Sequence, residues 1–215
     1  MLGKLKYIWE DNKKYFYVAC ILMLAGGFIG FVQADKVEKI ALQMLAQLKD
    51  LVEKIGSNND ALSVFWLIFS NNVTSAVLMM VFGIALAIPP VFGMVTNGIL
   101  LGYLFHKMAE SGQNIVQMFI VGILPHGIFE LPAVIFAAGV GIRYGLLMIR
   151  GPLAIWTEKG RSEFKADWVH ALKQFPYIVV SVILMLFVAA IVESVITPAL
   201  IENTIGNQIK LIPNK

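Results

Sequence analysis

Two residues near the middle of the sequence combine the side chains that bind metal ions and transfer protons. His126 and Glu130 are four residues apart, so on a helix both side chains lie on the same face. An imidazole and a carboxylate are both ligands that Zn²⁺ accepts. The flanking segments are strongly apolar, and a titratable pair is costly in apolar surroundings. The pair is therefore our first candidate for a functional site.

A metal site is one interpretation of this pair, although two ligands do not complete one. The same pair in a second copy of the chain would supply further ligands across a twofold axis. Polar residues of other segments are candidates to join or support the site: His106, Asn71, Asn72 and Asn97. Under this interpretation the cofactor is Zn²⁺, and His126, Glu130 and His106 are its predicted ligands.

Two other interpretations need no closed metal site. In the first, His126 and Glu130 hydrogen-bond to each other or to Asn71 and Asn72, and so hold the local helix in place. In the second, Glu130 is the base for a metal-bound water in an intramembrane hydrolase. A zincin would show H-E-x-x-H, which this sequence lacks, so we disfavour catalysis. The sequence alone does not choose between the structural pair and the metal site.

The composition is that of an integral membrane protein. Of the 215 residues, 58% are hydrophobic and 14% are charged, and mean hydropathy is +0.76. The single cysteine, Cys20, excludes an intrachain disulfide framework and a cysteine-based zinc site. A net charge of +3 is too small to indicate a nucleic-acid partner. We expect one all-α polytopic domain in a lipid bilayer.

Five apolar segments are long enough to cross a bilayer. They are residues 15–34, 62–88, 90–108, 131–149 and 175–196. The basic N-terminus and the basic loop over 150–173 predict that both lie in the cytoplasm, which places the C-terminus outside. Cleavage of the first segment after Ala34 is the competing interpretation, but its length favours an uncut span. Arg143 lies roughly two turns from the inner end of its span, where it can reach the headgroups or pair inside the helix bundle, and we favour the headgroups.

Residues 36–55 have the pattern of an amphipathic helix on the outer side. Its apolar stripe includes Val37, Ile40, Met44, Leu48 and Leu51. The interpretation that we favour puts this stripe against the protein's own spans or in the headgroup layer. The alternative is a docking surface for a partner or a second copy.

A broken helix is predicted around His126. A single helix over residues 115–149 would be roughly 50 Å long, against a hydrocarbon core of about 30 Å. Pro125–Gly127 is the expected break, preceded by a half-helix over 115–124. Further on, Gly141 and Gly145 form a small-residue face that suits close helix contact. Together with the incomplete ligand set, this face predicts a homodimer.

Three segments of the sequence resemble the stage II sporulation protein M family. They are residues 68–72 with Asn71 and Asn72, residues 97–102, and residues 126–133. The resemblance implies a polytopic membrane subunit that acts in endospore formation and is not itself an enzyme. It also implies that the protein localises two peptidoglycan-degrading partners, sporulation proteins D and P, during engulfment of the forespore.

A transporter or channel for an ion or small molecule, built by a dimer, is the alternative function. Broken helices with polar residues near mid-membrane are how many transporters build their substrate sites. Five spans, however, give no inverted pair of repeats. The depth of His126 discriminates, because a transport site needs it near the midplane and a scaffold site does not.

Overall fold

The structure is a computed structural model that describes residues 2–53, 61–154 and 156–200. The described residues form helices and short turns and contain no strand, which confirms the predicted all-α fold. The elements are α1 Leu2–Val32, α2 Ala34–Glu53, α3 Ala61–Phe82, α4 Ile88–Glu110, α5 Ile115–Met118, the π-helix η1 Phe119–Ile123, α6 Leu124–Ala154, α7 Glu158–Ile191 and the π-helix η2 Val192–Ile196.

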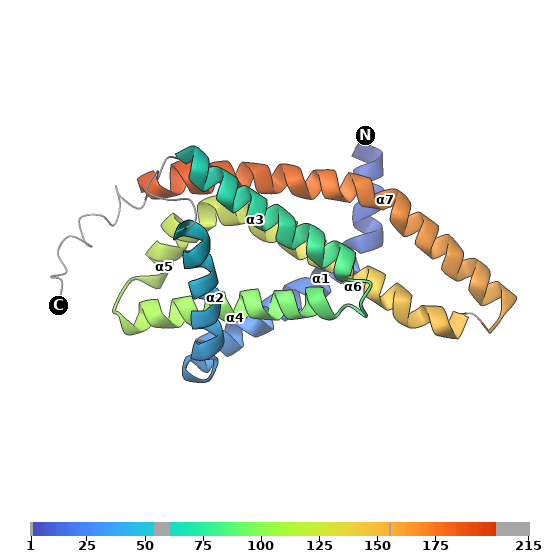
Figure 1. Ribbon diagram of the computed structural model, residues 1–215, viewed down its shortest axis with the longest axis horizontal. Coiled ribbons are helices and arrows are strands. Elements are labelled where there is room, and N and C mark those ends of the chain that lie inside the picture. Colours follow the sequence, from blue (N-terminus) through green and yellow to red (C-terminus); the bar gives the residue numbers. More distant parts are fainter. Residues whose placement is uncertain (1, 54–60, 155, 201–215) are drawn as a thin grey trace.

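Five helical stretches in the described part are long and apolar enough to cross a membrane. They are Lys6–Val32, Ala61–Phe82, Ile88–Glu110, Ile115–Pro152 and Glu158–Leu200. In Figure 1, α3, α4, α6 and α7 run lengthwise, and α2 lies across α4 at the end of the molecule that carries α5. The protein is a multi-pass membrane protein, as the composition predicts.

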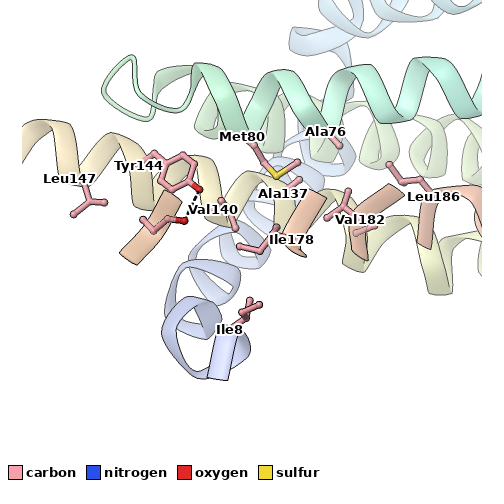
Figure 2. Packing of buried hydrophobic residues seen from close by; sticks show 12 residues of the cluster. Ile8, Ala76, Met80, Ala137, Val140, Tyr144, Leu147, Ile178, Val182 and Leu186 are labelled. Atoms are coloured by element: carbon pink, nitrogen blue, oxygen red, sulfur yellow. Dashed lines mark hydrogen bonds between the residues drawn. The ribbon is translucent and has the colours of Figure 1, made fainter. Parts of the chain in front are cut away.

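The core forms where α1, α3, α6 and α7 meet (Figure 2). Its buried side chains are Ile8, Ala76, Met80, Ala133, Ala137, Val140, Tyr144, Leu147, Ala171, Ile178, Val182 and Leu186. The hydroxyl of Tyr144 donates a hydrogen bond to the carbonyl oxygen of Ala171, 3.4 Å away. This core joins α6 to α7, the two helices that carry the candidate site.

Glycines let the helix backbones approach closely within the chain. A Cβ atom at Gly26 or Gly30 of α1 would collide with the backbone of α4, and one at Gly141 would collide with the carbonyl oxygen of Met79. At Gly145 the obstacle is the backbone of Ala87, which closes the turn between α3 and α4 with a φ of 63°. The face of Gly141 and Gly145, predicted to meet a second copy, therefore packs against the protein's own α3–α4 hairpin.

The amphipathic helix α2 rests on the protein's own spans. Val37 and Ala41 of α2 are buried with Tyr103 of α4, whose hydroxyl donates a hydrogen bond to Glu38 at 3.2 Å. Among the other stripe residues, Ile40 is exposed and Met44 is half-buried. The side chains of Leu48 and Leu51 lie outside the described part of the structure.

Arg143 does not reach towards the headgroups. It is 9% exposed and donates hydrogen bonds to Asn12 Oδ1 at 3.0 Å and Gln174 Oε1 at 2.7 Å. Asp11 accepts from Gln174 Nε2 at 2.5 Å and lies 2.6 Å from His170 Nε2. Arg143 stays inside the bundle because the side-chain oxygens of Asn12 and Gln174 lie within hydrogen-bonding reach of its guanidinium. These five residues, which we call the inner polar network, join α1, α6 and α7.

Two predicted irregular segments are more helical than expected. The backbone stays helical through Pro125–Gly127, and the irregularity lies earlier, in η1. Pro125 directly follows η1 inside one continuous helical run over Ile115–Pro152, where the wider hydrogen-bond pattern of η1 gives way to the regular pattern of α6. The loop predicted over 150–173 is short, because α7 begins at Glu158 after Thr157, whose hydroxyl accepts from the N–H of Gly160 at 3.0 Å and caps the helix.

Candidate metal centre

Three side chains converge between α6 and the end of the last helix. His126 and Glu130 come from α6, one helical turn apart as predicted, and Glu193 comes from η2. One ligand atom from each side chain lies within 4.8 Å of the other two. Ligand atoms of one tetrahedral zinc ion lie about 3.3 Å apart, given bonds of about 2.0–2.1 Å. A small side-chain adjustment would bring these three atoms onto a single ion.

Glu193 was not assigned to the site from the sequence. A carboxylate in an apolar stretch is costly unless it has a partner, and that signal already marks Glu193 as a candidate. Its partner could not be read from the sequence, because the fold brings Glu193 to α6 across more than sixty residues of chain. The π-helix around it is a feature that often occurs at functional sites.

Polar side chains from α3 and η2 hold the cluster. Asn72 lies beside the Glu130 side chain, and Asn71 Nδ2 donates to Asn72 Oδ1 at 3.5 Å. The structure thus brings both predicted supporting residues next to the cluster. On the other side, Thr197 Oγ1 lies 3.4 Å from His126 Nδ1.

A cavity of about 530 Å³ adjoins the cluster. It lies between α3 and α4, which diverge from their connecting turn towards the end of the molecule that carries α2 (Figure 1). Its polar lining consists of Asn71, Asn72, Asn97, His126, Glu130 and Glu193. Asn97 lines the cavity but donates its Nδ2 hydrogen bond to Gly93 of its own helix, at 2.8 Å.

His106 is the one predicted ligand that the structure leaves out of the cluster. Its Nε2 atom lies 3.8 Å from Glu110 on the same helix, and its ring meets the edge of Phe31. The three grouped ligands thus come from one chain without His106 and without a second copy.

The cluster lies level with the middle of a spanning helix. Asn71 and Asn72 are the central residues of α3, whose 22 residues are about 33 Å long at 1.5 Å per residue. This length matches a hydrocarbon core of about 30 Å. Because Asn72 lies beside Glu130, the Glu130 side of the cluster is close to the centre of α3.

The charges of the cluster are unbalanced. Among the residues that line the cavity in the described structure there are two carboxylates and no lysine or arginine. Two neighbouring carboxylates in apolar surroundings repel each other and are stable only with added positive charge, from a proton or a cation. A divalent ion bound by both carboxylates and a neutral imidazole gives a net charge of zero. The donor set of one nitrogen and two carboxylates fits Zn²⁺.

Residues 19–198 match the family described as stage II sporulation protein M. An uncharacterized protein of Methanocaldococcus jannaschii, MJ0706, is 30% identical over 145 residues, which are 67% of this chain and 60% of that protein. A second uncharacterized protein of the same organism, MJ0793, is 24% identical over 182 residues, or 84% of this chain and 93% of that protein. No solved structure matches the chain.

Proposed function

Because this chain belongs to the stage II sporulation protein M family, we propose that it is a non-enzymatic membrane scaffold with a bound divalent metal ion. The observation that carries the metal is the convergence of His126, Glu130 and Glu193 beside a cavity with no basic residue in its described lining. The ion would be Zn²⁺. The scaffold role, towards peptidoglycan-degrading partners such as sporulation proteins D and P, rests on the family alone.

The metal would act as a structural joint. His126 and Glu130 belong to α6 and Glu193 to η2, while Asn72 ties Glu130 to α3. A zinc ion held by these ligands would fix three spanning segments relative to one another. Metal binding of this kind contributes directly to the stability of the folded state.

The same lining argues against catalysis. His126, Glu130 and Glu193 are the titratable residues of the cavity lining in the described structure, and the proposal uses all three as ligands. No further carboxylate or imidazole of that lining is left to take a proton from a metal-bound water. A hydrolase would need such a group within hydrogen-bonding reach.

Elemental analysis of the purified protein tests the metal. We expect zinc in the wild type and its loss in His126→Ala, Glu130→Gln and Glu193→Gln. His106→Ala is the matched control, since it removes a histidine outside the cluster and should keep the zinc. A wild-type protein purified without chelator and free of metal would contradict the proposal, as would full zinc content in Glu193→Gln.

Transport of a cation is the second candidate function. The observation that favours it is the position of the cluster level with the centre of α3, where a transport site is expected. Reconstitution into liposomes with a zinc-sensitive dye separates the two functions. Zinc entry that Glu193→Gln abolishes would establish transport, whereas tightly bound zinc without entry would support the scaffold.

A further inference from the structure

Thr197, at the end of η2, lies between His126 and the backbone of its own helix. The side chain is buried, with 6% of its surface exposed. Its Oγ1 lies 3.4 Å from His126 Nδ1 and 3.3 Å from the carbonyl oxygen of Val192. In the described structure the Thr197 hydroxyl has these two hydrogen-bonding contacts. The carbonyl oxygen can only accept a hydrogen bond, whereas the imidazole nitrogen can donate or accept one.

The hydrogen bonds of the hydroxyl fix the proton on the imidazole. A threonine hydroxyl has one hydrogen to donate. The carbonyl oxygen of Val192 can only accept, so the 3.3 Å bond from Thr197 Oγ1 to that oxygen uses the hydroxyl hydrogen. The hydroxyl oxygen is then left to accept from His126, which requires a hydrogen on Nδ1. In a neutral imidazole with Nδ1 protonated, the lone pair is on Nε2.

We infer that Thr197 is a positioning residue that holds His126 in the Nδ1–H tautomer, with Nε2 as the atom available to a metal ion. The assignment of Nε2 as a zinc ligand rests on the proposed function, but the tautomer does not. Groups that bond to the second nitrogen of a metal-binding histidine orient the ring and raise its affinity for the metal. Thr197 therefore belongs to the proposed site as a residue that orients a ligand without binding the metal itself.

The π-helix explains why Thr197 reaches this position. In η2 the N–H of Thr197 bonds to the carbonyl oxygen of Val192, five residues earlier, and the hydroxyl bonds to the same oxygen. Glu193 lies four residues before Thr197 in this widened turn. η2 and the residue directly after it thus carry both a candidate ligand and the group that orients His126.

Ser194 provides a matched control on the same element. It is 7% exposed, and its hydroxyl donates to the carbonyl oxygen of Ile191 at 3.3 Å. Its described hydrogen bond is to the backbone and not to His126. Removing this hydroxyl has the same backbone cost as removing that of Thr197, without the effect on the imidazole.

Nitrogen NMR of ¹⁵N-histidine-labelled protein tests the inference, with His126→Gln used to assign the signals. We expect the Nδ1–H tautomer in the wild type and in Thr197→Ser and Ser194→Ala, and a mixture of tautomers in Thr197→Val. Zinc affinity should fall about 10–100-fold in Thr197→Val and stay within a few-fold in the other two variants.

An Nε2–H tautomer in the wild type would overturn the inference, and so would an unchanged spectrum and affinity in Thr197→Val. If Thr197→Val does not fold, the wild-type spectrum still decides. A wild type with the Nδ1–H tautomer but no zinc affinity would support the role of Thr197 and overturn the proposed metal function, so the two failures are distinguishable.

Discussion

The inner polar network and the cavity cluster both place charged side chains among apolar helices, but they balance charge in opposite ways. In the network, Arg143 and Asp11 have opposite charges and are linked through Gln174. In the cluster, Glu130 and Glu193 have the same charge, and the described cavity lining holds no cation. The network is complete in itself, whereas the cluster needs a positive ion or a proton from outside the chain.

The packing around the two regions also differs: it is tight beside the inner polar network and open beside the cluster. Beside the network, glycines of α6 touch the α3–α4 hairpin so closely that a single methyl group would not fit. Beside the cluster, α3 and α4 diverge around the cavity. A closed, charge-balanced network indicates a structural role, and an open cluster with excess negative charge indicates a ligand site.

The largest expected effect is on the tight packing. Gly145→Leu should prevent folding, because the added side chain would collide with the backbone of Ala87, which cannot move without opening the turn. Gly122→Leu is the control, since nothing lies within 4 Å of a Cβ atom at that glycine. The measurement is the yield of monodisperse protein in detergent. Equal yields for the two variants would contradict the described contact.

The next effect is on the inner network. Arg143→Met removes the charged donor of two buried amide oxygens, Asn12 Oδ1 and Gln174 Oε1. We expect a loss of about 1–3 kcal/mol in the free energy of unfolding, because buried acceptors lose a hydrogen bond from a charged group. Lys173→Met removes an exposed cation next to Gln174 and should cost far less. Thermal unfolding of the two variants in detergent makes the comparison.

Removal of a charge from the cluster, unlike removal of Arg143, should not lower the free energy of unfolding. In the presence of a chelator, Glu193→Gln is expected to be at least as stable as the wild type, because it relieves the repulsion with Glu130. With zinc added at one hundred times the dissociation constant, the wild type should gain about 2.7 kcal/mol and the variant should not. A variant that is less stable than the wild type under chelator would show that the cluster is a structural pair.

The smallest expected effect is on partner capture by the amphipathic helix α2. If the proposed peptidoglycan-degrading partners bind to α2, charge reversal of the exposed Lys39 should lower their capture several-fold, because exposed charges at the rim of an interface act mainly on the association rate. Lys159→Glu, on the exposed start of α7, is the control. Co-purification from detergent extracts measures capture relative to the protein level. If Lys39→Glu captures as much as the control, α2 is not the docking surface.

Local features of the candidate site could be predicted from the sequence. His126 and Glu130 share a face because four residues make about one helical turn, and the spanning segments follow from hydropathy. The contribution of Glu193 depends on how α7 packs against α6, and that of Thr197 depends on a π-helix that hydropathy does not reveal. The prediction for Arg143 was wrong because its partners, Asn12 and Gln174, lie on two other helices.

Two segments that the sequence predicts to be irregular are helical in the structure, and the reasons lie in their local sequence. A proline predicts the end of a helix, but Pro125 lies inside a continuous helical run, directly after η1, where the regular hydrogen-bond pattern is already interrupted. Charged residues over 158–173 were interpreted as a loop, whereas they form the exposed face of α7, which Thr157 caps. A capping residue before a charged segment was the signal that would have predicted this helix.

The zinc content of three purified proteins tests the central contrast most directly: the wild type, Glu193→Gln and Arg143→Met. The account predicts about one zinc ion per chain in the wild type and in Arg143→Met, and none in Glu193→Gln, because the excess negative charge that attracts the ion belongs to the cluster alone. Zinc that is absent from the wild type, or that survives in Glu193→Gln, would contradict the assignment of this cluster as a metal site.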